Sequence, residues 1–184
     1  MDARRRSKGA DLPLAGVSSL SRSTLAAATE LVLLGCFSRF VPEGATGRAL
    51  KTGLQGMARH IGTSAEQTML KQFLKRVADP LPPDALPASL LHRGLSGPGR
   101  ARLTEDLHLL STIGHLPPGC PQKAAVLVLQ GNQDAIVIEP IRRLLLRDLN
   151  LHLLSEPCAP HLEGHGHALI TPPLLRLVLQ WLDD

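Results

Sequence analysis

The sequence is poor in aromatic side chains. Among its 184 residues there are no tyrosines, one tryptophan and three phenylalanines. Because single-stranded nucleic acids are usually bound by stacking their bases on aromatic rings, this composition argues against nucleic acid as a partner. Leucine, valine, alanine and isoleucine must instead fill the core. Hydrophobic residues account for 43% of the chain, an ordinary share for a globular protein, so a mostly disordered chain is excluded.

A long apolar segment is also missing. No apolar stretch reaches about 18 residues, the length at which a membrane-spanning helix is predicted, so no membrane is expected as a partner. The formal net charge is +4, and much of it comes from Arg4, Arg5, Arg6 and Lys8, which we interpret as a solvated tail. A secretory signal would need a continuous apolar segment behind these charges, but serines and an arginine interrupt residues 18–23.

Cysteine is scarce as well. Cys36, Cys120 and Cys158 are odd in number and far apart, which argues against a disulfide framework. A reducing compartment, and hence a cytoplasmic location, is expected.

Three short apolar runs are continuous rather than alternating: residues 31–34 (LVLL), 124–129 (AAVLVL) and 151–154 (LHLL). Such runs, bounded by Gly, Asn or Ser, predict strands that are covered on both faces of a parallel sheet. A weaker candidate strand is residues 12–15, which ends at Gly16. Helical patterns separate or follow the runs, which is the alternation typical of an α/β fold.

Residues 42–120, between the first two strong runs, are predicted to form helices only. Apolar side chains recur there at helical spacing in three stripes: Leu50, Leu54, Met57 and Ile61; Met69, Leu70, Phe73, Leu74 and Val77; Leu103, Leu107, Leu110 and Ile113. Residues 64–67 (SAEQ) predict a capping box at Ser64 for the second helix, and Gly114 predicts the end of the third. An all-helical block inserted into a parallel sheet is typical of a cap.

Two more helices are predicted after the second strong run. Residues 138–149 carry Pro140 in the first turn, where proline is tolerated, and the apolar residues 172–182 should pack on the sheet. We therefore divide the chain into a degenerate leader at residues 1–30 with a candidate elbow strand, a core at 31–41 and 121–184, and a helical cap at 42–120.

Two chemically capable side chains follow predicted strands. Asp134 lies on a short loop directly after the second strong run, and functional groups collect at the carboxyl ends of parallel strands. His167 lies on a glycine-containing loop after the third run, where it could act as a general base. Each has a simpler interpretation, Asp134 as a turn cap and His167 as a polar surface residue. Together they form an acid-then-base pair in which Asp134 would orient the imidazole.

The same loop allows metal binding as a rival interpretation. Its four candidate ligands are Cys158, His161, His165 and His167. Their spacing matches no standard zinc pattern, and a second ligand cluster is missing. We expect neither a metal nor a cofactor.

Three segments resemble known α/β-hydrolases. Residues 128–134 (VLQGNQD), and Gly166-His167-Ala168 with Pro172, resemble the acid and base segments of that superfamily. Residues 31–41 (LVLLGCFSRFV) resemble the strand and exit loop before the helical cap of the pimeloyl-[acyl-carrier protein] methyl ester esterases of biotin synthesis. The resemblance covers about residues 31–184. It implies a partial α/β-hydrolase fold, a mostly parallel sheet with an inserted all-helical cap, and carboxylic ester hydrolysis.

The resemblance also implies a nucleophile. The superfamily places it in a Gly-x-Ser-x-Gly elbow, upstream of the Asp and the His. Residues 16–20 (GVSSL) match the first glycine and the serine but carry Leu20 in place of the second glycine. Ser18 is thus the expected nucleophile, and the backbone N–H of Ser19 the expected oxyanion donor. The family's upstream strands are absent, so we expect a chain truncated or shortened at its N-terminus.

A partner is implied too. In that subfamily the cap and its basic residues receive an acidic acyl-carrier protein. The basic residues of the corresponding block are Arg59, Lys71, Lys75, Arg76, Arg93 and Arg102. The competing interpretation is a solvated helix face, since half of any amphipathic helix is polar.

The alternative to an active esterase is a catalytically inactive hydrolase remnant or binding module. Leu20 and the absent strands favour that alternative, whereas the retention of Asp134 and His167 opposes it.

Overall fold

The computed structural model describes residues 22–86, 94–169 and 171–183. The described chain begins with helix α1 (Arg22–Ala26) and strand β1 (Glu30–Leu34), followed by α2 (Gly44–His60), α3 (Glu66–Ala78), the 3₁₀ helix η2 (Pro83–Ala85) and α5 (Gly97–Thr112). Strand β2 (Ala125–Leu129), α6 (Glu139–His152) and α7 (Pro172–Asp183) complete it. None of the helices in these ranges is both long and apolar enough to cross a membrane. The predicted strand at residues 12–15 and the basic residues 4–8 lie outside the described ranges.

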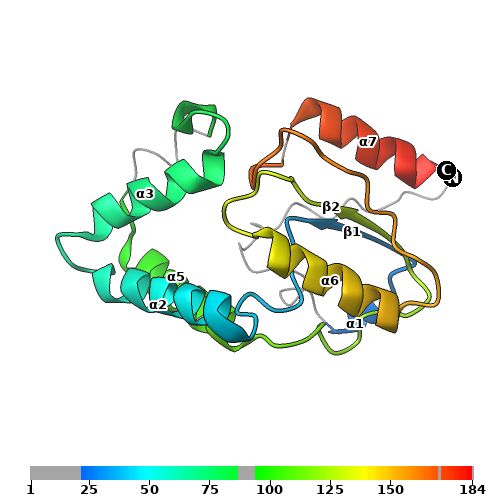
Figure 1. Cartoon of the computed structure of the whole chain (residues 1–184), viewed down its shortest axis with the longest axis horizontal. Coiled ribbons are helices and arrows are strands. Elements are labelled where there is room, and N and C mark those ends of the chain that lie inside the picture. Colours follow the sequence, from blue (N-terminus) through cyan, green and yellow to red (C-terminus); the bar gives the residue numbers. More distant parts are fainter. Residues whose placement is uncertain (1–21, 87–93, 170, 184) are drawn as a thin grey trace, which may run out of the picture.

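The two strands pair in parallel over their full length, from Glu30 opposite Ala125 to Leu34 opposite Leu129. A third segment follows the other edge of β2, where Cys158 and Leu162 make isolated parallel bridges to Leu127 and Gly131. Strand β2 is therefore central among the described residues. The predicted α/β alternation with a parallel sheet is confirmed, and Figure 1 shows α6 and α7 beside these strands.

The predicted strand at residues 151–154 is wrong. Helix α6 continues to His152, because Leu153 extends the buried face that Ile141, Leu145 and Leu149 form at every fourth position. Leu151 and Leu154 are instead exposed. The segment that borders β2 contains Pro157 and Pro160. Since proline has no backbone N–H to donate to a sheet, this segment forms isolated bridges rather than a regular strand.

The predicted capping box at Ser64 is also wrong. Helix α3 has Ala65 at its N-cap, without a capping side chain. Thr63 Oγ1 accepts a hydrogen bond from Ala65 N at 3.2 Å, and the Glu66 carboxylate accepts one from Gly62 N at 2.6 Å. The chain turns at Gly62, which has φ +76°, and this turn brings the N–H of Gly62 to the Glu66 carboxylate. Ser64 is exposed.

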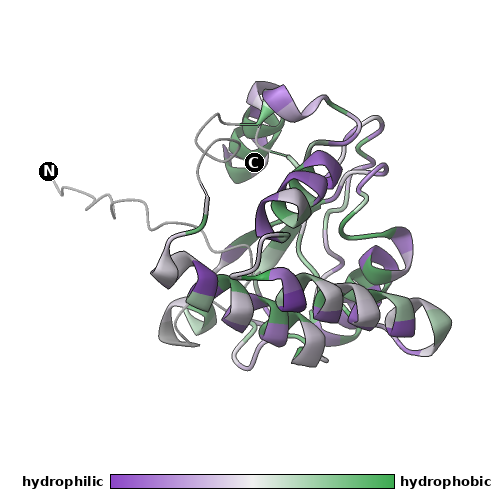
Figure 2. Ribbon diagram, turned by 90° about the vertical axis from the view of Figure 1, so that its left-hand side faces the viewer, coloured by the Kyte–Doolittle hydropathy of each residue, from purple (hydrophilic) through white to green (hydrophobic). Residues whose placement is uncertain are grey.

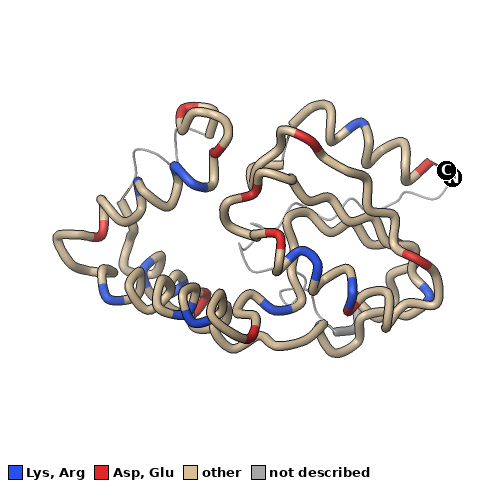
Figure 3. Tube along the Cα trace, viewed as in Figure 1, with Lys and Arg blue, Asp and Glu red and all other residues tan. Residues whose placement is uncertain are grey.

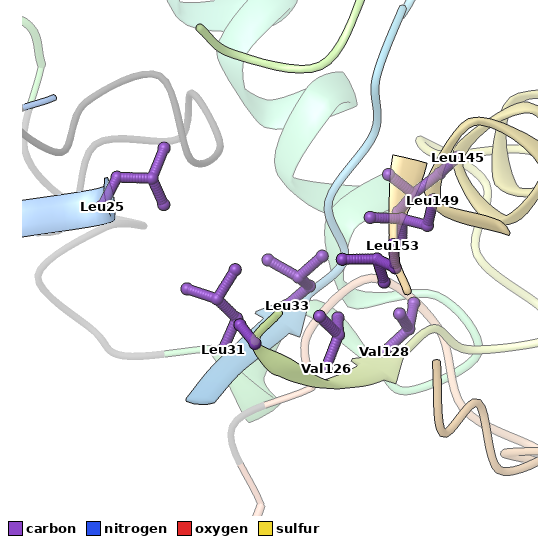
Figure 4. Packing of buried hydrophobic residues seen from close by; sticks show 9 residues of the cluster. Leu25, Leu31, Leu33, Val126, Val128, Leu145, Leu149 and Leu153 are labelled. Atoms are coloured by element: carbon purple, nitrogen blue, oxygen red, sulfur yellow. The ribbon is translucent and has the colours of Figure 1, made fainter. Parts of the chain in front are cut away.

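Strand β2 is covered on both faces, as predicted. Its alternate side chains Val126 and Val128 pack with Leu145 and Leu149 of α6, as Figure 4 shows. Leu127 faces the other way, into a cluster with Leu174 that includes the inner side of α7. Each fully buried leucine contributes about 1.5–3 kcal/mol to the free energy of folding. The packing of α6 and α7 on the two faces of β2 therefore anchors the loops at both strand ends.

The helices between the strands form one group beside the sheet (Figure 1). Helices α2 and α5 share a cluster in which Leu54 and Leu107 meet Phe40, Val137 and Ile141 of the core. Figure 2 shows hydrophilic and hydrophobic residues interspersed along these helices. This shared cluster joins the helical block to the start of α6.

An ion pair links α3 to α5. Arg100 Nε lies 2.7 Å from Glu66 Oε2, and Arg100 Nη2 lies 3.0 Å from Glu66 Oε1. The hydrogen bond from Arg100 lowers the pKa of the Glu66 carboxyl below its usual value. The two-point contact fixes the relative orientation of the two helices.

A second polar cluster holds the linker between β1 and α2 against α6. The buried Ser38 hydroxyl donates to Asp148 Oδ2 at 2.6 Å, and Arg39 Nη2 lies 3.6 Å from the same oxygen. Arg147 Nη2 lies 3.1 Å from Asp148 Oδ1. Burial by itself would raise the pKa of Asp148, but the hydrogen bonds from Ser38 and Arg147 and the two positive charges outweigh burial and hold that pKa below its usual value.

Asp148→Asn should lower the free energy of unfolding by about 1.5–3 kcal/mol near neutral pH, the usual contribution of hydrogen bonds to a charged group. Since the folded-state pKa of Asp148 is lowered, its stabilisation is complete above the unfolded-state pKa of about 3.9 and is lost as the pH falls through the folded value. Urea unfolding of both proteins across this acidic range should show the difference shrinking.

The matched control is Asp106→Asn, which removes an i,i+4 pair with the half-exposed Arg102 and should cost under about 1 kcal/mol. Equal losses in the two variants, or a loss that does not change with pH, would contradict the assignment.

Candidate active site

The loop after β2 carries a buried carboxylate. Asp134 is 4% exposed, and its Oδ1 accepts hydrogen bonds from the backbone N–H groups of Ile136 at 2.7 Å and Val137 at 2.8 Å. A buried carboxylate needs such donors to offset the loss of water. The turn thus satisfies one oxygen and leaves Oδ2 for a partner from elsewhere in the chain.

That partner is His167. Its Nδ1 lies 2.9 Å from Asp134 Oδ2, across 33 residues of sequence. Because a carboxylate only accepts, Nδ1 must carry the proton and donate it, so neutral His167 has its lone pair on Nε2. Nε2 has no hydrogen-bond partner among the described residues. The arrangement leaves an oriented, basic nitrogen able to accept a proton.

The two loops approach each other because Gly131 has no side chain. A Cβ at that position would lie 2.1 Å from the carbonyl oxygen of His165 and 2.4 Å from that of Gly166. In this close approach Gln133 N donates to His165 O at 2.9 Å, and Asn132 N donates to Leu162 O at 3.1 Å. Backbone contacts therefore set the spacing of the acid and base loops.

A second glycine brings the end of β1 against the imidazole. Gly35 has φ +56°, and a Cβ there would lie 3.4 Å from His167 Cε1. Gly35 N donates to Leu129 O at 2.9 Å, which extends the parallel pairing past β1. The ring of His167 is thus confined on the side of β1, and its side chain is 17% exposed.

The helical block also touches the base loop. A Cβ on Gly166 would lie 1.6 Å from the carbonyl oxygen of Asp79 and 3.0 Å from Pro80 Cδ. Asp79 is the C-cap of α3. The end of α3 is therefore in direct contact with the residue that precedes His167.

Of the predicted site residues, the structure brings together Asp134 and His167; their catalytic roles stay predictions. Ser18 and Ser19 lie outside the described residues, as does Arg93. Arg59 at the end of α2, and Lys71, Lys75 and Arg76 on α3, are exposed; Figure 3 shows the basic residues along these helices. Arg102 pairs with Asp106, with 3.2 Å between Nε and Oδ1.

The candidate metal ligands do not converge. Within the described ranges no three or more His, Cys, Asp or Glu side chains are grouped so that they could hold a metal ion. His161 Nε2 lies 3.7 Å from Glu163 Oε1, and His165 Nδ1 lies 2.8 Å from the carbonyl oxygen of Glu163. The described side chains therefore give the metal interpretation no support.

Sequence reasoning missed the roles of two residues that hold the loop around Asp134 through hydrogen bonds to the backbone. Arg142 Nη1 donates to Val137 O at 2.8 Å, and Asn132 Oδ1 accepts from Gly164 N at 2.9 Å. Arg142 has the pattern of an ordinary charged position on an amphipathic helix, so no sequence signal sets it apart. Asn132 lies two residues before Asp134, and that proximity is the one signal that could have drawn attention to it.

Three of the solved proteins that the structure resembles illustrate its likeness. One is an esterase from Exiguobacterium antarcticum, with TM-score 0.60, 15% identity, and coverage of 84% of this chain and 56% of that one. Another is an α/β-hydrolase enzyme from a Medee basin deep-sea metagenome library, with TM-score 0.57, 14% identity and coverage of 89% and 60%. A third is an esterase from Rhodococcus sp. ECU1013, with TM-score 0.50, 17% identity and coverage of 85% and 55%. A scan against family models and a comparison with curated proteins gave no match.

These likenesses establish the fold. The chain has a partial α/β-hydrolase fold with a small parallel sheet and helices, as expected from the sequence. It spans 56% of the first of these proteins and 60% of the second.

Proposed function

We propose that this chain is a carboxylic ester hydrolase that acts through Ser18, Asp134 and His167. The observation that carries the proposal is the 2.9 Å contact between His167 Nδ1 and the buried Asp134 carboxylate. The α/β-hydrolase fold supports it, as do the neighbours that are themselves named esterases. Fold alone does not define a function, so the acid–base pair is the stronger support.

The chemistry follows from the two nitrogens of His167. Nε2 would take the proton of Ser18 Oγ as the oxygen attacks the ester carbonyl carbon. The backbone N–H of Ser19 would donate to the resulting oxyanion. Collapse of this intermediate breaks the ester C–O bond, and Nε2 returns its proton to the leaving alcohol. Water then attacks the acyl-enzyme and loses a proton to Nε2. As the bond from the acyl carbon to Ser18 Oγ breaks, Nε2 returns that proton to Ser18 Oγ and the carboxylic acid is released.

The finer part of the proposal concerns the substrate. The resemblance of residues 31–41 to the pimeloyl-[acyl-carrier protein] methyl ester esterases points to an acyl methyl ester on a carrier protein. Exposed cationic side chains on α2 and α3, including Arg59, Lys71, Lys75 and Arg76, offer charge complementary to an acidic carrier. Docking there would bring the acyl chain to the cap, whose α3 end contacts Gly166 beside His167.

The test is covalent labelling of the full chain with a fluorophosphonate, followed by peptide mass mapping. An activated serine displaces fluoride and forms an O–P bond, so one label is expected on Ser18, together with hydrolysis of a short-chain p-nitrophenyl ester. Both should be lost in Ser18→Ala and retained in the control His161→Ala, which alters an exposed histidine outside the pair.

Label on another serine would overturn the role of Ser18. The nucleophile whose proton His167 takes would then have to be reassigned. Soluble, folded protein without label or hydrolysis would instead favour the second candidate, an inactive hydrolase remnant or binding module. The feature that favours this candidate is Leu20, which replaces the glycine that lets the helix pack closely on a nucleophile elbow.

A further inference from the structure

The guanidinium of Arg142 spans the loop that carries Asp134. Its Nη1 donates to Val137 O at 2.8 Å, and its Nη2 donates to Asn132 O at 3.3 Å. These two carbonyl groups bracket Asp134 on either side. Because Arg142 lies in the first turns of α6, which packs on the sheet through Leu145 and Leu149, it connects a rigid element to both ends of the loop.

The same loop is joined to the base loop through Asn132. Its backbone carbonyl accepts from Arg142, while its side-chain Oδ1 accepts from Gly164 N at 2.9 Å. Gly164 has φ +69° and lies three positions before His167. A continuous chain of contacts therefore runs from α6 through Arg142 and Asn132 to the loop that holds the imidazole.

We propose that Arg142 is a positioning residue that, through Asn132, holds the acid and base loops in register, so that Asp134 Oδ2 meets His167 Nδ1. This inference rests on the proposed function, because it assigns Arg142 a role in that same site. The turn of Asp134 is itself held by two backbone donors, Ile136 N and Val137 N. The hydrogen bonds from Gln133 N to His165 O and from Asn132 N to Leu162 O set the spacing of the two loops, and the Arg142 fork adds a restraint on both flanks of the turn that carries Asp134.

The geometry of arginine suits this task. Its planar guanidinium presents several donors in a rigid fork, whereas the ammonium of lysine is a compact charge on a flexible stem. A lysine here would offer a single nitrogen in place of the two that bond Val137 O and Asn132 O. The neighbouring Arg143 pairs with Glu139 on the exposed side of the same helix and makes no such bridge among the described residues, so it provides a matched control.

The experiment compares Arg142→Met, Arg142→Lys and Arg143→Met in the full chain. In Arg142→Met, kcat for a p-nitrophenyl ester should fall by about 10- to 100-fold with little change in KM, because a small misplacement of a reacting group costs rate rather than binding. Proton NMR should show the His167 Nδ1–H resonance broadened or lost, and hydrogen exchange of the Gly164 amide should be faster. Arg143→Met should match the wild type in all three measurements.

The NMR measurements need no activity, so they separate this inference from the proposed function. A wild type without hydrolysis, but with a His167 resonance that disappears in Arg142→Met, would refute the esterase and support the positioning role. An unchanged resonance, amide exchange and kcat in Arg142→Met would overturn the role of Arg142. Full recovery in Arg142→Lys would show that its charge, and not its bridge, matters, and would overturn it as well.

Discussion

Asp134→Asn should lower kcat for ester hydrolysis by about 10⁴-fold while the protein remains folded. The carboxamide has the same shape as the carboxylate, so its oxygen keeps the hydrogen bonds from the N–H groups of Ile136 and Val137. Its NH₂ group would then face His167 Nδ1 and could only donate. His167 would have to place its proton on Nε2, the nitrogen that must accept the proton of the nucleophile.

Steady-state kinetics with a p-nitrophenyl ester and a thermal melt would measure both effects. The matched control is Asp84→Asn, because Asp84 is exposed in η2 and should affect neither quantity. A loss in Asp134→Asn of less than about tenfold, or one accompanied by unfolding, would mean that Asp134 acts as a turn cap and not as the orienting acid. The simpler interpretation of Asp134 would then replace ours.

Gly131→Ala should impair both stability and activity. The added Cβ would lie 2.1 Å from His165 O and 2.4 Å from Gly166 O, and both atoms belong to the backbone, which cannot rotate away like a side chain. The base loop must move, at a cost of about 1–3 kcal/mol for an overpacked site. That movement separates His167 from Asp134, so kcat should fall by about 10²-fold or more.

Gly53→Ala is the control for this change. Gly53 is exposed on α2, and a Cβ there would meet nothing within 4 Å. Alanine in a helix loses less conformational entropy on folding, so this variant should gain about 0.4–1 kcal/mol. Denaturant unfolding and kinetics of the two variants should therefore diverge in sign for stability, and a Gly131→Ala protein as stable and active as Gly53→Ala would refute the close approach of the loops.

Most helices could be predicted from the sequence because their apolar side chains recur with the period of a helix. The stripes with Leu54, Met69 and Leu107 lie on α2, α3 and α5, and each of these three residues is buried. Pro140 marked the first turn of α6. Periodicity records which face is buried, and burial is the main source of helix stability in a folded protein.

The strands were harder, because a short continuous apolar run suits both a buried strand and a buried helix. The run at residues 31–34 became β1, but the run at 151–154 joined α6, since Leu153 continues its inner face. The segment beside β2 contains prolines and no apolar run. Nevertheless the backbone of Cys158 donates a hydrogen bond to Val126 O and accepts one from Val128 N. Which segment occupies a sheet edge depends on available backbone partners, and these lie far away in sequence.

The candidate site divides in the same way. Residue type, position after predicted strands and the family resemblance singled out Asp134 and His167, because functional groups gather at the carboxyl ends of parallel strands. The strand expected before His167 is instead the end of α6 and the residues after it. Their 2.9 Å contact, the need for glycine at position 131 and the bridge from Arg142 arise from the tertiary structure. Each depends on two backbone segments meeting at one distance, and a local pattern of hydrophobic and polar residues carries no record of that distance.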